Sequence, residues 1–260
     1  MEMQHYPAGT PSWIDIGVPD MDDAVAFYGG LFGWAFDEPD DATGGYRQAR
    51  KDGAAVAGFG PQMNPGPPFW ATYVAVESAD ATTDAVQAAG GTVVLPPMDV
   101  LEFGRMAVYA DDAGAFFSVW QAGTHPGVGR CNEPGTLTWN ELTTREPGKA
   151  KAFYGAVFGW GAKDNPMGPV TYTEWQLDER TIGGMMPMEG DMWPAELPNH
   201  WMVYFGTDDT DAACARVTEL GGAVSVAPFD IPAGRIAVVN DRAGAFFSLI
   251  TLSPEMAAQA

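Results

Sequence analysis

The chain is poor in basic residues and in histidine. Its 260 residues include 13 Lys and Arg against 34 Asp and Glu, which gives a formal net charge of −21, and only 3 histidines. A charge of this sign argues against nucleic acid and against anionic membrane surfaces as partners. It would attract a cationic ligand, although a solvated acidic surface explains the same composition.

Cysteine and long apolar runs are scarce as well. The two cysteines, Cys131 and Cys214, are too few for a disulfide framework. No apolar run approaches the ~20 residues that span a bilayer. The polar start, Met1–Pro7, lacks the basic segment of a secretory signal. We therefore expect a cytoplasmic protein without a membrane partner.

The sequence contains an internal duplication. Ala26–Gly29 (Ala-Phe-Tyr-Gly) returns unchanged at Ala152–Gly155, 126 residues later. Gly114–Ser118 (Gly-Ala-Phe-Phe-Ser) returns at Gly244–Ser248, 130 residues later. A repeat of this length has the size of a small domain and is too long for a solenoid unit. Each residue of one copy can therefore be compared with its counterpart in the other.

The duplication predicts a first domain at residues 10–121, a linker at 122–135 and a second domain at 136–251. Each copy contains two successive units of strand, helix and three strands. Aspartates that can cap a helix, terminal glycines and the turn pair Asp52-Gly53 mark the boundaries. In the first copy we expect strands at 12–18, 46–50, 54–59, 69–76, 92–95, 105–109 and 115–120, helices at 23–31 and 80–89, and a loop at 99–104 that borders a cavity.

Two signatures carry a resemblance to a known family. Val-Pro-Asp-Met-(x)4-Ala-Phe-Tyr-(x)3-Phe-Gly-Trp at Val18–Trp34 resembles the first unit of the vicinal oxygen chelate superfamily, and Asp111–Val119 resembles its closing strand. Both recur, at Thr144–Trp160 and Asp241–Leu249. The family includes glyoxalase I, extradiol dioxygenases and bleomycin-resistance proteins. The resemblance implies an α+β fold of tandem vicinal-oxygen-chelate-like domains, in which paired βαβββ units form cupped mixed sheets whose hollow holds the ligand.

Enzymes of this family usually hold a divalent metal with His and Glu at fixed strand positions. The resemblance places other residues there: Trp13, Gly58, Ala71 and Ser118 in the first copy, and Trp139, Gly184, Met202 and Ser248 in the second. A zinc or iron centre needs three or four convergent N, O or S ligands. We therefore expect no metal and no other cofactor; His200, at a strand start, is the histidine closest to a ligand position.

Aromatic side chains and hydroxyls are expected to line the hollows in place of a metal. Alternation along a strand puts every second residue on one face. Apolar walls with a few polar groups are typical of small-molecule pockets, although the same pattern also fits an ordinary core. The expected ligand-binding residues are Trp13, Tyr73, Phe116, Ser118 and Trp120 in the first copy and Trp139, His200, Met202, Tyr204, Phe246 and Ser248 in the second.

One acidic residue recurs beside the tryptophan of each copy, at Asp15 and Glu141. A carboxyl group on a concave, partly apolar face has a raised pKa unless it is paired. It can then act as a general base or hold a ligand amine, so we name both as candidate catalytic residues. The alternative interpretation is an ion pair with Arg105 or Arg235.

Two classes of function fit these observations. The first is a metal-free protein that binds or sequesters an aromatic natural product or antibiotic, cationic or neutral, as the bleomycin-resistance branch does. The second is a metal-independent enzyme of secondary metabolism that uses acid–base chemistry at Asp15 or Glu141. A metal-dependent glyoxalase or dioxygenase ranks third. We expect a monomer whose two copies form a pseudo-dimer, or a weak homodimer.

Overall fold

The structure is a computed structural model that describes residues 1–63, 65–168, 170–191 and 193–258. The first copy forms one eight-stranded sheet with two α-helices. Its elements are β1 (Pro11–Val18), α1 (Met21–Phe32), β2 (Ala35–Phe36), the short 3-10 helix η1 (Asp41–Thr43), β3 (Arg47–Lys51), β4 (Ala54–Pro61), β5 (Trp70–Ala75), α2 (Ala79–Ala88), β6 (Thr92–Val100), β7 (Gly104–Ala110) and β8 (Phe116–Ala122).

The second copy repeats this order, followed by a short C-terminal helix. Its elements are β9 (Leu137–Thr144), α3 (Pro147–Phe158), β10 (Gly161–Met167), β11 (Val170–Leu177), β12 (Arg180–Pro187), β13 (His200–Gly206), α4 (Thr210–Glu219), β14 (Ala223–Ile231), β15 (Gly234–Asn240), β16 (Phe246–Leu252) and α5 (Pro254–Ala257). The predicted α+β class and the two βαβββ units per copy are confirmed.

Local sequence sets the helix ends, as expected. The Asp20 side chain accepts a hydrogen bond from the backbone N–H of Asp23 and so caps α1. Gly33 ends the helix with φ at 70°, a left-handed conformation that suits glycine. One expectation was wrong. Strand β6 continues to Val100 and strand β7 begins at Gly104, so the loop predicted at 99–104 is only a tight turn between the two strands.

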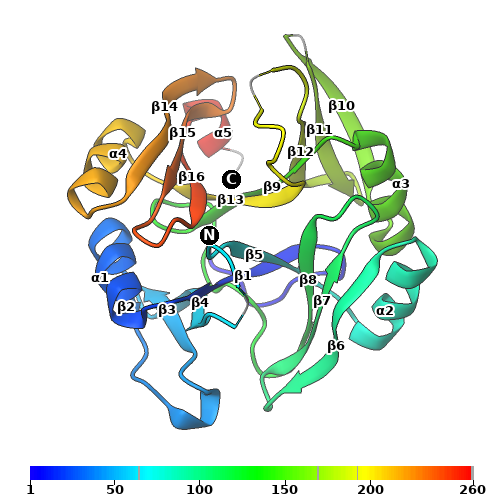
Figure 1. Cartoon of the computed structure of the whole chain (residues 1–260), viewed down its shortest axis with the longest axis horizontal. Coiled ribbons are helices and arrows are strands. Elements are labelled where there is room, and N and C mark those ends of the chain that lie inside the picture. The colour runs from blue at the N-terminus through cyan, green and yellow to red at the C-terminus, as the bar shows by residue number, and fades with distance from the viewer. Residues whose placement is uncertain (64, 169, 192, 259–260) are drawn as a thin grey trace.

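The two sheets have the same strand order. It is β2-β3-β4-β1-β5-β8-β7-β6 in the first copy and β10-β11-β12-β9-β13-β16-β15-β14 in the second. In both sheets the first strands of the two βαβββ units are antiparallel neighbours at the centre. Each sheet curls into a cup, and the two cups lie back to back and open in opposite directions (Figure 1).

The helices and the convex faces of the sheets make the core between the copies. Strand β5 contacts β13, α1 lies beside α4, and α2 lies beside α3 (Figure 1). One apolar cluster joins the α1 half of the first copy to the α4 half of the second, and another joins the α2 and α3 halves. Burying apolar surface on both sides of this interface stabilises the two copies as one unit.

The signatures that carried the family resemblance meet across this interface. The hydroxyl of Tyr28 donates to the Asp241 carboxylate at 2.9 Å and accepts from the Trp70 indole at 3.1 Å. The symmetric contacts join Tyr154 to Asp111 at 3.1 Å and Trp201 to Tyr154 at 2.9 Å. Each aspartate also accepts backbone N–H groups of its own turn. These motifs therefore hold the fold together and are not parts of a reactive site.

Among the described residues, no helix has the length and apolar character needed to cross a bilayer. Both cysteines are free thiols.

Candidate functional site

Backbone register brings the expected positions together on each concave face. Ile14 packs on the convex side of β1 within the α1 core, so alternation turns Trp13 and Asp15 to the other face. Trp13 lies opposite Tyr73, which lies opposite Ser118. In the second copy the same row is Trp139, Tyr204 and Ser248. We call these two faces the first cup and the second cup.

The acidic residues form the next row of each cup. Asp15 lies between Gly58 on β4 and Ala71 on β5. Glu141 lies between Gly184 on β12 and Met202 on β13. Of the four positions that the resemblance compares with metal ligands, two therefore flank the carboxylate in each copy, and the other two lie in the row of Tyr73 or Tyr204.

Two tyrosines hold the carboxylate of the first cup. The hydroxyls of Tyr73 and Tyr46 donate to Oδ2 of Asp15 at 2.9 and 3.3 Å. The indole N–H of Trp13 donates to the Tyr46 hydroxyl at 3.0 Å. Because both tyrosines use the same oxygen, Oδ1 of Asp15 keeps its capacity to accept a hydrogen bond from a ligand.

The second cup has the same arrangement with a longer acid. The indole N–H of Trp139 donates to the Tyr172 hydroxyl at 2.9 Å, and the Tyr204 hydroxyl donates to Oε1 of Glu141 at 2.8 Å. Tyr172 also hydrogen-bonds to Glu141. Each cup thus contains a cluster of tryptophan, two tyrosines and a carboxylate, which we call the cup cluster.

A glycine makes room for the cluster in each cup. A Cβ atom at Gly58 would lie 1.6 Å from the Tyr46 hydroxyl, and one at Gly184 would lie 1.8 Å from the Tyr172 hydroxyl. The tyrosine ring therefore crosses the strand where any larger side chain would stand. A glutamate at this position, as in glyoxalases, is incompatible with this tyrosine placement.

Burial changes the acidity of both carboxyl groups. Loss of hydration raises the pKa of Asp15 to about 6, although the hydrogen bonds from Tyr73 and Tyr46 oppose the change. Burial likewise raises the pKa of Glu141, opposed by Tyr204 and Tyr172. Burial also raises the pKa of these four tyrosines far above neutral pH, so they stay protonated donors. The carboxyl groups are the titratable members of each cluster.

The two cups differ in what covers their tryptophan. Trp13 is only 3% exposed, because it packs in a buried cluster with Tyr6 and Val128 and the ring of His125 from the linker stands edge-on to it at a centroid distance of 4.3 Å. The indole N–H of Trp120 donates to the backbone carbonyl of His125 at 2.8 Å. Trp139 keeps partial exposure, although it packs against a small buried cluster of Tyr204, Ile236 and Ile250. The first cup is therefore partly filled by the chain itself.

The other expected residues lie on the walls and rims of the cups. Phe116 and Phe246 are about half exposed, at 49% and 52%, where β8 and β16 begin. The Phe116 ring lies 6.3 Å from that of Phe69. His200, at the start of β13, bonds through Nδ1 to the carbonyl of Pro198 at 2.8 Å, and its burial lowers its pKa.

Exposed apolar side chains continue along one wall of each cup. Strand pairing places Leu95 and Met98 of β6 on the face that carries Ser118. Val226 and Phe229 of β14 take the equivalent places in the second cup. All four are exposed although they are large and apolar. Exposed apolar side chains gathered on a concave face are typical of a binding surface.

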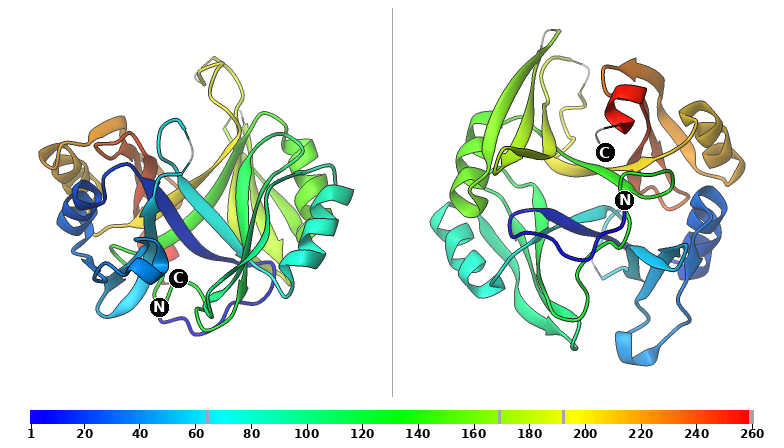
Figure 2. Two further views of the ribbon diagram at one scale, coloured as in Figure 1. Left: turned by 60° about the horizontal axis from the view of Figure 1, so that its bottom comes forward. Right: turned by 180° about the vertical axis from the view of Figure 1, so that it is seen from behind.

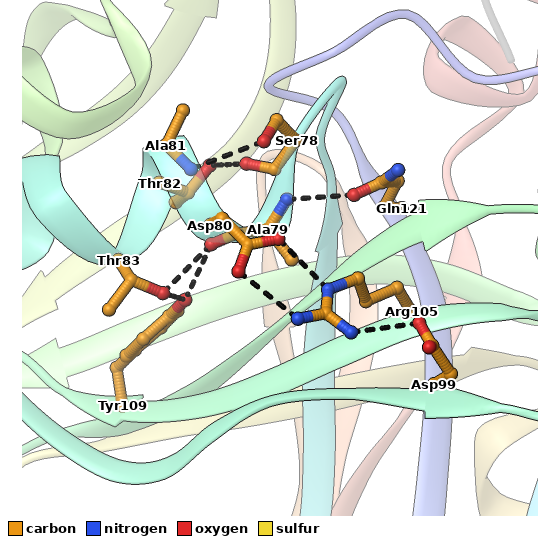
Figure 3. A network of polar contacts seen from close by, with 10 residues as sticks. All are labelled: Ser78, Ala79, Asp80, Ala81, Thr82, Thr83, Asp99, Arg105, Tyr109 and Gln121. Atoms are coloured by element: carbon orange, nitrogen blue, oxygen red, sulfur yellow. Dashed lines mark hydrogen bonds and ion pairs between the residues drawn. The ribbon is translucent and has the colours of Figure 1, made fainter.

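The alternative of an ion pair for Asp15 or Glu141 is wrong. Arg105 binds Asp80 and Asp99 at the outer edge of the first sheet, at 2.9 and 2.8 Å, as Figure 3 shows. Arg235 binds Asp211 and Asp230 in the same way in the second copy. Both arginines are satisfied away from the cups, so no described cation neutralises the cluster carboxylates.

The donors in the cups do not fit the metal site of related enzymes. The four family positions hold indole, glycine, methyl or thioether, and hydroxyl groups, none of which suits Zn²⁺ or Fe²⁺. Within the described ranges no three His, Cys, Asp or Glu side chains converge into a set that could hold a metal ion. Two small depressions, of about 20 and 130 Å³, lie near Phe27 and Pro134 and contain no cluster residue.

Sequence reasoning missed three of these residues. Tyr46 and Tyr172 are separated by the same 126 residues as Trp13 and Trp139, so the repeat itself contained the signal. His125 has no such signal. It lies in the linker, and only the path of the chain brings it to Trp13.

Family comparison agrees with the fold. The model of the glyoxalase/bleomycin resistance protein/dioxygenase superfamily matches residues 10–119 and again residues 136–249. The chain therefore belongs to this superfamily and contains two domains of the family in tandem.

Similar proteins come from actinobacteria and from structurally characterised enzymes. CFP32 of Mycobacterium tuberculosis, provisionally named a glyoxylase, is 41% identical over 96% of this chain and 97% of its own length. The anthracycline biosynthesis protein DnrV of Streptomyces peucetius is 39% identical over 96% of both chains. The Mn(II)-bound glyoxalase of Novosphingobium aromaticivorans superposes with a TM-score of 0.65 at 17% identity, over 94% of this chain and 82% of its own. At that identity it supports the fold alone.

Proposed function

We propose that the chain binds an aromatic small molecule of secondary metabolism on the concave face of a cup, without a metal. The observation that supports this proposal is the cup cluster, a tryptophan, two tyrosines and a carboxylate joined by hydrogen bonds on the concave face of both copies. A tryptophan face accepts planar rings, and the carboxylate accepts a hydroxyl or an amine. The apolar wall strands would cover the remaining ring surface.

Charge supports a ligand that carries an amine. The net charge of −21 attracts cations over long range, and Asp15 and Glu141 have no cationic partner among the described residues. Screening limits this attraction to about 10 Å in 0.1 M salt, so it should raise the association rate more than the affinity. A protein named for anthracycline biosynthesis, 39% identical to this chain, makes polycyclic aromatic compounds reasonable first probes.

The test is a titration with an anthracycline that carries an amino sugar, followed by tryptophan fluorescence and calorimetry. We expect saturable binding that quenches tryptophan emission, with slower association as salt rises. The matching aglycone, which lacks the amine, should bind more weakly. Elemental analysis of the same sample should find no stoichiometric Zn, Fe, Ni or Mn. Absence of binding to either compound would end the proposal.

One observation favours a second candidate, a metal-independent acid–base enzyme. A carboxyl group with a pKa of about 6, as at Asp15, can take or give a proton near neutral pH. If the chain is this enzyme, Asp15→Asn or Glu141→Gln should abolish conversion of an anthracycline-type polyketide while binding remains. Chromatography with mass spectrometry would detect the product. Binding without any product would favour the first candidate.

A further inference from the structure

We propose that the second cup is the ligand site of the chain and that His125 of the linker occupies the corresponding site of the first cup. This inference rests on the proposed binding function and assigns it to one copy. Its basis is the difference between two tryptophans that share the same strand position, the same tyrosine partner and the same neighbouring carboxylate.

The first cup is filled at its tryptophan end. His125 contacts Trp13 edge-on at 4.3 Å and Trp120 at 5.8 Å. Its ring is neutral at pH 7, since burial and the nearby Arg50 lower its pKa to about 4. A ligand ring that stacked on Trp13 would have to displace this imidazole.

The linker is anchored on both sides of His125, so the imidazole is not easily displaced. The Trp120 indole holds the His125 carbonyl, and the Tyr6 hydroxyl donates to the Val128 carbonyl at 2.9 Å. The backbone N–H of Val128 donates to the carbonyl of Ser12 at 2.8 Å, directly beside Trp13. The N-terminal segment and the green linker run side by side along the first copy (Figure 2).

In the second copy the chain after β16 forms α5, which lies over the second cup (Figure 1), but the apolar cluster that contains Trp139 includes no residue of this helix. The repeat shift of 130 residues places Glu255 at the position equivalent to His125. Glu255 is exposed, because the chain turns into α5 after Ser253, whose side chain caps the Met256 N–H. The counterpart of Trp120 is Ile250, whose side chain has no N–H to hold a covering segment. Trp139 remains partly exposed, in contrast to Trp13.

The chemistry of the second cup suits a planar ring system with an amine. Trp139 supplies the aromatic face, and Val226, Phe229 and Phe246 supply an exposed apolar wall. Glu141 is 7% exposed and its Oε1 accepts a hydrogen bond from Tyr204, so it offers an acidic group at a fixed position below the ring site. The first cup has these groups too, but its tryptophan is covered.

The experiment is a calorimetric titration of the whole chain with an anthracycline that carries an amino sugar, in three variants. The parent should bind one ligand per chain. Trp139→Phe should weaken binding by about tenfold, because a smaller ring offers less stacking surface. Trp13→Phe, the matched change in the first cup, should leave the affinity within about twofold.

Removal of the covering residue completes the test. His125→Ala should expose the edge of Trp13 and so increase the quenching of tryptophan emission by acrylamide, while the number of bound ligands stays at one because Tyr6 and Val128 still pack in the Trp13 cluster. The exposed His5→Ala is the control and should change neither quantity. Two ligands bound by the parent, a single ligand lost with Trp13→Phe, or unchanged acrylamide quenching in His125→Ala would each overturn the assignment to the second cup. Binding by no variant would instead overturn the proposed function itself.

Discussion

The first and second cups are two versions of one design. Both place a tryptophan, two tyrosines and a carboxylate at the sheet centre, and both need a glycine beneath one tyrosine. They differ in the acid, which is Asp15 in one and Glu141 in the other, and in the linker that covers Trp13. The shared part follows from duplication of a strand pattern, whereas the difference follows from where the chain goes after each copy ends.

The largest expected contrast is in stability. Trp13→Ala removes a ring that is almost fully buried and should lower the free energy of unfolding by roughly 3–5 kcal/mol. Trp139→Ala removes a partly exposed ring and should cost about half as much. Urea denaturation of both variants measures the difference. Equal losses would mean that the linker does not bury Trp13 in solution.

Glycine substitution should show what the cups share. Gly58→Ala and Gly184→Ala each place a methyl group within 2 Å of a tyrosine hydroxyl, so Tyr46 or Tyr172 must leave the cluster. We expect each variant to lose on the order of 2 kcal/mol, since a buried carboxylate and an indole N–H lose a partner. Thermal unfolding measures the loss, and Gly148→Ala, where no atom lies within 4 Å, is the control. A loss of stability in only one of the two variants would show that the other cup does not need its glycine.

Neutralising the acids should stabilise the chain near pH 7. The folded-state pKa of Asp15, about 6, lies above its unfolded value of about 3.8, so the group lowers stability as pH rises through that window and stays unfavourable above it. Asp15→Asn should therefore add about 1 kcal/mol at pH 7, after allowance for solvent screening, and nothing near pH 3. Denaturation at both pH values tests this. Glu141→Gln should change stability in the same direction, and destabilisation by either variant would show a hidden cationic partner.

The smallest effect is expected at the outer edges of the sheets. Asp80→Ala and Asp211→Ala each remove an exposed carboxylate from an arginine that keeps a second acidic partner. Exposed ion pairs contribute about 0–1 kcal/mol, and salt screens them. Both variants should therefore unfold within about 0.5 kcal/mol of the parent. A large loss in one of them would show that the two edges are not equivalent.

Much of the fold could be predicted from the repeat. The helix caps at Asp20 and Gly33, the turn at Asp52-Gly53 and the two units per copy follow from local chemistry that short sequence segments contain. The lengths of the strands were harder to predict from the sequence. The strand β6 runs past the expected end, because pairing with β7 continues to Val100 through a tight turn.

The sequence by itself determined the duplicated architecture and the alternation that turns Trp13, Asp15, Trp139 and Glu141 to one face. The tertiary structure decided that Tyr46 and Tyr172 reach those carboxylates and that Arg105 and Arg235 do not. It also decided that His125 contacts one tryptophan while the other remains partly exposed. Local rules fix the face on which a side chain lies, because strand geometry repeats every two residues. They do not fix its partners, because the partner residues lie in segments far away along the chain, and a local sequence pattern does not show which distant segments come together.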